Sequence, residues 1–293
     1  MLNQELIHNV VRAALAEDVG AGDITSKSAI PADARADAVI VAKEPCIVAG
    51  LPLAEAVFRE LDAKVSVKTL AKEGDVVGQG ERVCLLSGPA RAILTGERTA
   101  LNFLQRLSGI ATLTRQFVEA VAAVCDRRGN KPQILDTRKT TPTLRALEKY
   151  AVAVGGGQNH RMGLFDAVMI KDNHRMTLAR LGPNALGDAV AAARKNHPQV
   201  PIIIEADTLE QVEEALAAGT DHILLDNMTP DELREAVKLV GGRAKTEASG
   251  GVRLANIAEI AATGVDYISV GALTHSAKAA DFSMEILGES ASE

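Results

Sequence analysis

Residues 133–272 repeat one pattern, and this repetition limits the possible folds more than any other feature of the sequence. Each repeat is a short apolar run, a polar residue and then an Ala-rich stretch with helical spacing. The runs are 133–135, 167–170, 201–204, 222–225, 244–247 and 267–270. Alternating strands and helices of this length predict βαβ units and a parallel sheet. With at least six such strands, an α/β barrel is favoured over an open sheet.

The first third of the chain follows a different pattern. Apolar residues at helical spacing predict an amphipathic helix over residues 3–17, which Gly20 and Gly22 end. Residues 36–86 alternate short apolar runs with glycines and charged pairs, which is typical of strands and turns. A helical periodicity then runs from Pro89 to Gly109, and a second helix is expected over 113–124. We place a domain boundary near residue 113.

Polar residues and glycines follow the predicted strands of the second domain. In a parallel barrel the carboxyl ends of the strands converge on one face, where the functional groups of such enzymes lie. A single mouth would therefore hold several cations, two carboxylates and two glycine-rich turns. The candidates are Asp136, Arg138, Lys139, Lys171, Glu205, Asp226, Ser249, Gly250, Gly251 and Gly271.

Five cationic or potentially cationic residues stand at or near two of these strand ends, in a protein whose formal charge is -6. Arg matches a carboxylate or phosphate with a planar fork and Lys supplies a point charge, so the mixture predicts ligands with several anionic groups. A single Arg is more simply interpreted as a solvated surface charge, and a core or capping role for the histidine stays open. The residues are Arg138, Lys139, His160, Arg161 and Lys171.

Glu205 and Asp226 each end an apolar run, and their hard oxygen ligands would suit Mg²⁺ together with substrate phosphate. Structural ion pairing is an equally good explanation for either residue alone. The glycine turns at 249–251 and 270–272 follow the last two strands, where barrels often bind phosphate through backbone N–H groups. Taken alone, each of these glycine segments is also typical of an ordinary turn with no binding role.

Composition and missing motifs exclude several function classes. Lys and Arg number 32 against 38 Asp and Glu, and there is no Trp, so general nucleic-acid binding is not expected. The sequence lacks the P-loop, the dinucleotide-binding glycine motif, the zinc-protease motif and the serine-hydrolase elbow. Cys46, Cys84 and Cys125 are too widely spaced for a disulfide framework, and no apolar leader or membrane span is found. These features predict a reducing, cytoplasmic location.

A set of motifs, in order along nearly the whole chain, resembles the quinolinate phosphoribosyltransferases. The motifs are EDVGAGDIT at 17–25, ERTALN at 97–102, LSGIAT at 107–112, DTRKTTP at 136–142, NHR at 159–161, IKDNH at 170–174, Glu205 with Asp207, LDN at 225–227, SGG at 249–251 and VGALTH at 270–275. The resemblance implies transfer of a phosphoribosyl group from 5-phosphoribosyl-1-pyrophosphate to quinolinate with loss of CO₂. Nicotinate mononucleotide and pyrophosphate are the other products, in de novo NAD biosynthesis.

The resemblance also implies a fold. Residues 1–113 would form an N-terminal α/β sandwich, 114–275 an incomplete, open α/β barrel of the type II phosphoribosyltransferase kind, and 276–293 a tail that returns to the first domain. Residues 125–132 look like a short polar extension before the first barrel strand.

Roles follow from the resemblance, residue by residue. Quinolinate would be bound by Thr137, Arg138, His160, Arg161 and Lys171, with Arg98 contributed by the partner subunit of a homodimer. The phosphoribosyl donor would be bound by Lys139, Glu205, Asp226, Ser249, Gly250, Gly251, Val270, Gly271, Ala272 and His275. Glu205 and Asp226 would hold Mg²⁺, and the catalytic set would be Lys139, Lys171, Glu205 and Asp226. Without the resemblance, Arg98 looks like one more helical cation beside Arg91 and Arg106.

Two other interpretations compete with this one. A divergent relative could act on another aromatic carboxylate, although the cations expected to bind two carboxylates are all present. A non-catalytic carrier module is indicated by residues 72–81, which resemble a strand pattern of biotinyl and lipoyl domains. The modifiable Lys motif of those domains is missing, so we interpret the segment as shared architecture.

Overall fold

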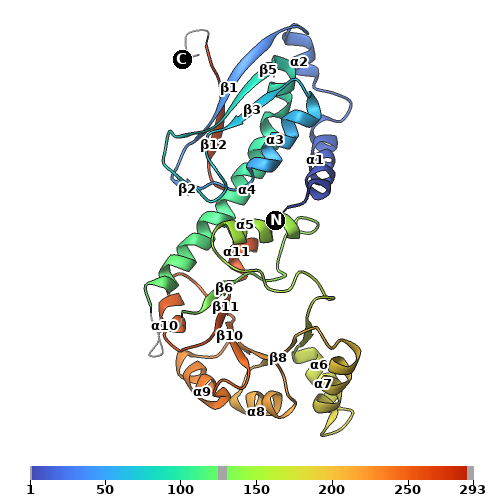
Figure 1. Cartoon of the computed structure of the whole chain (residues 1–293), viewed down its shortest axis with the longest axis vertical. Coiled ribbons are helices and arrows are strands. Elements are labelled where there is room, and N and C mark those ends of the chain that lie inside the picture. The colour runs from blue at the N-terminus through green and yellow to red at the C-terminus, as the bar shows by residue number, and fades with distance from the viewer. Residues whose placement is uncertain (1, 125–130, 289–293) are drawn as a thin grey trace. The chain divides into compact units, whose positions relative to one another are not determined.

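The computed structural model describes residues 2–124 and 131–288 of the chain (Figure 1). The chain divides into two units. The first comprises the residues up to Leu113, Ala146–Gly155 and the segment from Ala277 onward, and the second comprises Thr114–Arg145 and Gly156–Ser276. Most of the polar extension expected at 125–132, with Cys125, lies outside the described residues. No helix in the described part is long and apolar enough to cross a membrane.

The first unit contains a four-stranded antiparallel sheet in the order β12-β1-β5-β3 and a separate pair formed by β2 and β4. Its strands are β1 Arg35–Ala42, β2 Cys46–Ile47, β3 Ser66–Thr69, β4 Val76–Val77, β5 Arg82–Pro89 and β12 Phe282–Ile286. Its helices are α1 Gln4–Val19, α2 Ile24–Ala29, α3 Leu51–Leu61, most of α4 Ala90–Ala122 and nearly all of α5 Arg145–Val154. The last strand, β12, pairs with the first, so the end of the described chain belongs to this unit.

Helix α1 confirms the helix predicted at the start of the chain. Asn3 caps it by accepting a hydrogen bond from the backbone N–H of Leu6, and the helix ends at Gly20, whose φ is +52°. Ile7, Val11 and Leu15 recur at helical spacing and are buried. The apolar stripe thus attaches the helix to the core of the unit.

The prediction of two helices around residue 110 is wrong, because α4 is one helix that continues through Gly109. Gly109 does not have the positive φ of a helix-ending glycine. A Cβ at this position would lie 2.0 Å from the carbonyl oxygen of Lys278, so the glycine allows close packing of the backbone of the returning segment. The glycine that was interpreted as the end of a helix therefore allows another backbone segment to pack closely against the helix.

The second unit contains a six-stranded parallel sheet in the order β6-β11-β10-β9-β8-β7. Its strands are β6 Gln133–Leu135, β7 Val168–Ile170, β8 Ile202–Ala206, β9 His222–Asp226, β10 Lys245–Ser249 and β11 Tyr267–Ser269. Its helices are α6 Asp172–Ala179, α7 Ala185–Asn196, α8 Leu209–Ala217, α9 Pro230–Val240, α10 Ile257–Ala261 and α11 Ala272–His275. Among the described strands β6 and β7 stand at opposite ends of the order, which confirms the open barrel.

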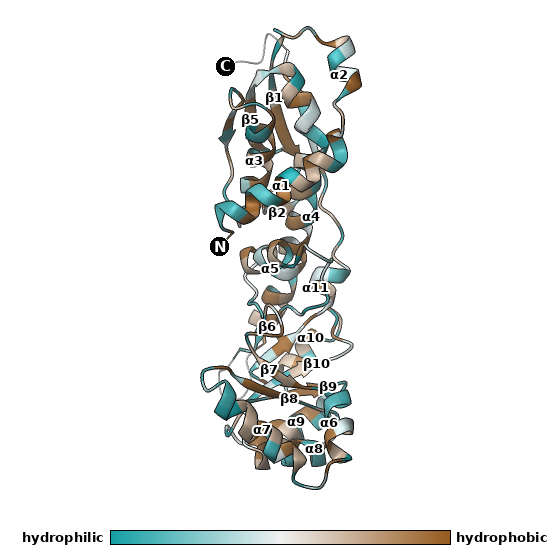
Figure 2. Ribbon diagram, turned by 90° about the vertical axis from the view of Figure 1, so that its right-hand side faces the viewer, coloured by the Kyte–Doolittle hydropathy of each residue, from teal (hydrophilic) through white to brown (hydrophobic). Residues whose placement is uncertain are grey.

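Apolar strands form the centre of this unit. Ile202, Ile203 and Ile204 of β8 are buried, and Figure 2 shows this strand in the brown of apolar residues. Strands buried on both faces read as continuous apolar runs, which is why the sequence pattern located them. At the edge of the sheet, Gln158 forms a parallel bridge with Leu135 of β6. Gln158 accepts a hydrogen bond from the N–H of Asp136 and donates one to the carbonyl of Ile134.

Candidate functional site

The register of the parallel strands places the predicted residues at one edge of the sheet. Ser249 pairs with Asp226 across β10 and β9, and Ile170 pairs with Ile204, so that Lys171 and Glu205 follow at the same level. Leu135 pairs with Ser269, so that Asp136 and Val270 follow together. The strand ends of the second unit therefore gather cations, carboxylates and glycine turns, as βα loops of barrels do.

Lys171 and Glu205 form an ion pair with 3.3 Å between Nζ and Oε2. The N–H of Asp172, at the start of α6, donates to the other oxygen of Glu205 at 3.3 Å. Glu205 is mostly buried, whereas half of the Lys171 side chain is exposed. A cation assigned to quinolinate and a carboxylate assigned to the phosphoribosyl donor are thus in direct contact, and the two binding regions adjoin.

Asp207 is a third carboxylate near the two that are predicted to bind the metal. Asp207 directly follows β8, and the pairing of Ala206 with Leu225 places it level with Asp226. Desolvation raises the pKa of Asp207, and the charges of Asp226, Glu205 and Asp172 raise it further. Asp207 is part of the motifs that resemble the family, but the resemblance implies no role for it. Its signal in the sequence was the two-residue spacing from Glu205.

This donor set fits Mg²⁺ only with help from substrate. Among the described residues, no three His, Cys, Asp or Glu side chains form a ready metal cage. Two or three carboxylates from neighbouring strands are nevertheless what Mg²⁺ uses when waters and substrate phosphates complete its octahedral shell. Glu205 and Asp226 therefore fit a metal that binds together with a diphosphate.

The turn after β10 is built for close backbone approach. Gly250 has a φ of +90°, and a Cβ there would lie 2.2 Å from Oδ1 and 2.9 Å from the backbone nitrogen of Asn227. Asn227 itself adopts a left-handed φ of +54° and donates its N–H to the carbonyl of Ser249 at 2.9 Å. The two turns after β9 and β10 therefore fix each other.

We expect Gly250→Ala to lower the free energy of unfolding by about 2–3 kcal/mol, because the new Cβ meets backbone and the left-handed φ disfavours a side chain. Gly251→Ala is the matched control, since Gly251 has a φ of +59° and nothing within 4 Å of its Cβ position. This control should cost about 1 kcal/mol. Urea unfolding followed by circular dichroism measures both, and equal losses would contradict the steric argument.

Lys139 lies beside the second glycine turn. A Cβ on Gly271 would be 3.2 Å from Lys139 Cδ and 3.1 Å from His275 Nε2. The backbone carbonyl of Lys139 accepts a hydrogen bond from Thr274 Oγ1 at 2.7 Å, and its N–H donates to Thr137 Oγ1 at 3.0 Å. Val270 is buried just before this turn, and Ala272 begins α11. The structure thus brings together Lys139, Gly271 and His275.

Arg138 and Arg161 form a partly buried cationic pair. Burial and the charge of Arg138 lower the pKa of Arg161, while Asp166 raises it. Arg161 donates to the carbonyl of Ala167 at 3.1 Å and contacts the sulfur of Met169. Among the described residues, the buried Nε of Arg138 has no hydrogen-bond partner. Two like charges held together with an unused donor favour an anion between or beside them.

His160 is nearly buried and lies between two carboxylates. Its backbone N–H donates to Asp136 Oδ1 at 2.8 Å, and its Nε2 lies 3.3 Å from Glu247 Oε2. His222 Nε2 approaches the same oxygen at 3.0 Å. Burial alone would raise the pKa of Glu247, but its contacts with the two histidines lower it to about 2. Sequence reasoning missed Glu247 and His222, because Glu247 looked like the polar end of the run 244–247 and no local signal marks its burial.

Arg98 belongs to a different unit from the other predicted residues. It is exposed on α4 in the first unit, and all the others belong to the second unit. Its neighbour Thr99 is buried, and the Thr99 hydroxyl donates a hydrogen bond to Asp18 Oδ2 at 3.1 Å. This contact helps to fix the orientation of α4, with Arg98 exposed to solvent.

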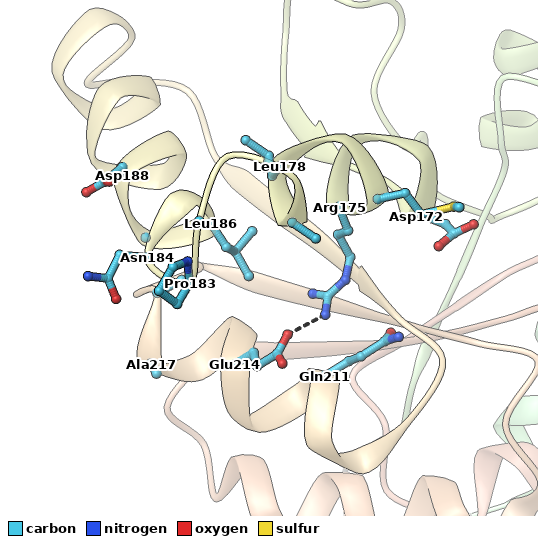
Figure 3. Close-up of a pocket in the computed structure, with 15 residues that line it drawn as sticks. Asp172, Arg175, Leu178, Pro183, Asn184, Leu186, Asp188, Gln211, Glu214 and Ala217 are labelled. Carbon is cyan, nitrogen blue, oxygen red and sulfur yellow. Dashed lines mark hydrogen bonds and ion pairs between the residues drawn. The ribbon is translucent and has the colours of Figure 1, made fainter.

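A separate cavity of about 980 Å³ lies between α6, α7 and α8 (Figure 3). Arg175 and Glu214 form an ion pair across it, with 2.6 Å between Nη2 and Oε2. Its lining includes none of the predicted site residues. The strand ends, with their convergent charges, are therefore the candidate active site.

Comparisons with known proteins identify the family. The family profile for the quinolinate phosphoribosyl transferase C-terminal domain matches residues 110–285, and that for the N-terminal domain matches 23–108. A probable carboxylating nicotinate-nucleotide pyrophosphorylase of Bacillus subtilis is 48% identical, over 92% of this chain and 90% of the relative. A chloroplastic relative from Arabidopsis thaliana is 44% identical, over 97% and 84%.

Solved structures agree with this assignment. The nicotinate-nucleotide pyrophosphorylase of Francisella tularensis is similar to this chain with a TM-score of 0.89 and 37% identity, over 98% of both chains. The two-domain fold, the converging strand ends and the sequence matches over both domains lead to one conclusion: the chain belongs to the quinolinate phosphoribosyltransferase family.

Proposed function

We propose that this chain catalyses transfer of the phosphoribosyl group from 5-phosphoribosyl-1-pyrophosphate to quinolinate, with decarboxylation, in NAD biosynthesis. The products are nicotinate mononucleotide, pyrophosphate and CO₂, and the enzyme is a pentosyltransferase. The observation that carries the proposal is the pair Arg138 and Arg161, two half-buried cations whose charges repel each other, with an unused donor on Arg138. A dianionic aromatic acid would relieve their repulsion and satisfy that donor.

The reaction requires mainly that the two substrates are positioned and that the charge on the departing pyrophosphate is stabilised. Arg138, Arg161 and Lys171 would hold the carboxylates of quinolinate so that its ring nitrogen faces C1 of the ribose. Lys139, beside the turn of Gly271, would balance charge on the departing pyrophosphate. Bound at Glu205 and Asp226, Mg²⁺ would supply further neutralisation of that leaving group. Once the ring nitrogen is quaternised, its positive charge stabilises the carbanion formed by loss of the 2-carboxylate, so no organic cofactor is required.

The direct test follows quinolinate by its ultraviolet absorption in the presence of 5-phosphoribosyl-1-pyrophosphate and Mg²⁺, with product identified by chromatography. Nicotinate and nicotinamide serve as parallel substrates. Formation of nicotinate mononucleotide from quinolinate only, and its loss on addition of a chelator, are the expected results. Turnover of nicotinate instead, or no turnover of quinolinate, would contradict the proposed substrate.

A homodimer in which Arg98 enters the partner's active site is also part of the proposal. It is supported by the exposure of Arg98 in the first unit, away from the strand-end residues along the chain. If this is correct, Arg98→Ala and Arg161→Ala enzymes, assayed at quinolinate concentrations far below their raised KM values, should each be nearly inactive. They should regain activity when their subunits are mixed and exchanged. Random exchange restores one intact site in each hybrid, or about a quarter of wild-type activity. No recovery, despite exchange shown by mass spectrometry, would place Arg98 outside the partner's site.

A cytoplasmic location completes the proposal. Cys46 and Cys84 are buried free thiols, and burial raises their pKa to about 11 and about 12. Such thiols behave as small apolar core residues and need no oxidising compartment.

A further inference from the structure

Glu247 is the one charged residue in the centre of β10, and its side chain is fully buried. It stands two residues before Ser249, so alternation places both side chains on the same face of the sheet. Its register partners Leu224 and Tyr267 belong to β9 and β11. The carboxylate therefore lies one layer below the strand ends that form the candidate active site.

A buried carboxylate needs partners, and Glu247 has two imidazoles. Its Oε2 lies 3.3 Å from Nε2 of His160 and 3.0 Å from Nε2 of His222, and both are ion-pair contacts whose angles fall outside hydrogen-bond geometry. The side chains of these histidines are 9% and 13% exposed, so the contacts are shielded from water. The ring of His222 in turn packs against Tyr267, with 5.3 Å between ring centroids.

The other nitrogen of His160 is also engaged. Nδ1 accepts a hydrogen bond from the backbone N–H of Arg161 at 2.7 Å. A neutral imidazole that accepts at Nδ1 carries its proton on Nε2, which is the nitrogen that faces Glu247. Together with the bond from the His160 N–H to Asp136, these contacts fix the ring and the backbone of residues 160 and 161.

We infer that Glu247 is a positioning residue for quinolinate, acting through His160 to hold Arg161 in place. The inference rests on the proposed function. Glu247 orients the His160 ring from below, the ring fixes the Arg161 backbone, and the Arg161 guanidinium reaches Ala167 and the cation pair with Arg138. Buried partners of this kind orient ligand-binding groups and affect binding without touching the ligand.

The first test is Glu247→Gln, an isosteric change that removes the charge. The quinolinate KM should rise about tenfold, while kcat and the KM of the phosphoribosyl donor stay within about twofold. Asp266→Asn is the matched control. Asp266 is a partly buried carboxylate that accepts from Thr246 and pairs with Lys245, away from the strand ends. Its substitution should lower stability but leave both KM values unchanged.

The second measurement observes the His160 ring directly in the wild-type enzyme and is independent of the kinetics. Proton–nitrogen NMR correlation of ¹⁵N-histidine-labelled enzyme should show His160 with its proton on Nε2, assigned by comparison with His160→Gln. In Glu247→Gln this signal should shift or broaden.

A proton on Nδ1 of His160 would overturn the inference, as would an unchanged quinolinate KM in Glu247→Gln or an equal rise for both substrates. Wild-type enzyme that fails to use quinolinate would refute the proposed function instead, and the NMR signal would still report whether Glu247 orients His160.

Discussion

Arg161→Ala should raise the quinolinate KM about 30- to 100-fold and leave the KM of the phosphoribosyl donor nearly unchanged. Removing a partly desolvated cation from a charged ligand costs about 2–3 kcal/mol, and each 1.4 kcal/mol is about tenfold. The substitution also relieves the repulsion that Arg138 exerts, so the protein itself should unfold at the same or slightly higher temperature. Steady-state kinetics with each substrate varied in turn, and a thermal melt, measure these effects.

Arg194→Ala is the control for this prediction. Arg194 is about half exposed, donates to the carbonyl of Gly219 and pairs with Asp221 at 3.0 Å, in the helical layer of the second unit. Its loss removes a surface ion pair and should leave both KM values within about twofold. If Arg161→Ala resembles Arg194→Ala in its kinetics, Arg161 does not contact quinolinate.

Asp226→Ala should lower kcat/KM for the phosphoribosyl donor about 100- to 1,000-fold and raise the Mg²⁺ concentration needed for half-maximal rate. The reason is the loss of one of two carboxylates assigned to the metal–diphosphate complex. Asp207 directly follows β8 at the same level, so removing Asp226 also removes one of the charges that, after burial, raise the pKa of Asp207. The KM for quinolinate should change little.

Asp231→Asn provides the comparison for charge alone. Asp231 is exposed in the first turn of α9 and pairs with Arg234 in the same helix. Titrations of Mg²⁺ at fixed substrate concentrations should overlay for Asp231→Asn and wild type. An Asp226→Ala enzyme with a normal Mg²⁺ titration would remove Asp226 from the metal site.

Local pattern predicted the second unit well because its strands are short, continuous and apolar. The apolar run 202–204 fits a strand because short apolar runs alternate with helical stretches along this part of the chain. Glu205 and Asp226 lie at or next to the carboxyl ends of their strands. The same logic placed Lys171 and Glu205 at one mouth, since parallel strands end at one edge, and the structure shows that they form an ion pair there.

Contacts between distant segments could not be predicted in this way. Gly109 looked like the end of a helix because nothing in the sequence shows the carbonyl of Lys278 against it. Glu247 looked like the polar end of a run, whereas its burial depends on His160 and His222, which come from two other segments. The role of Arg98 came from family resemblance alone, because its exposed position on a helix has no distinguishing local signal.

The bridge between Gln158 and β6 covers part of one edge of the parallel sheet. An open parallel sheet presents unpaired N–H and C=O groups at its outer strands, and such edges invite pairing with other chains. Gln158 occupies part of this edge on β6, and two residues later the same segment becomes the His160–Arg161 turn. One short stretch therefore covers part of an exposed strand edge and carries the cation proposed to bind quinolinate. Substitutions that loosen it should cost yield through aggregation as well as affinity for quinolinate.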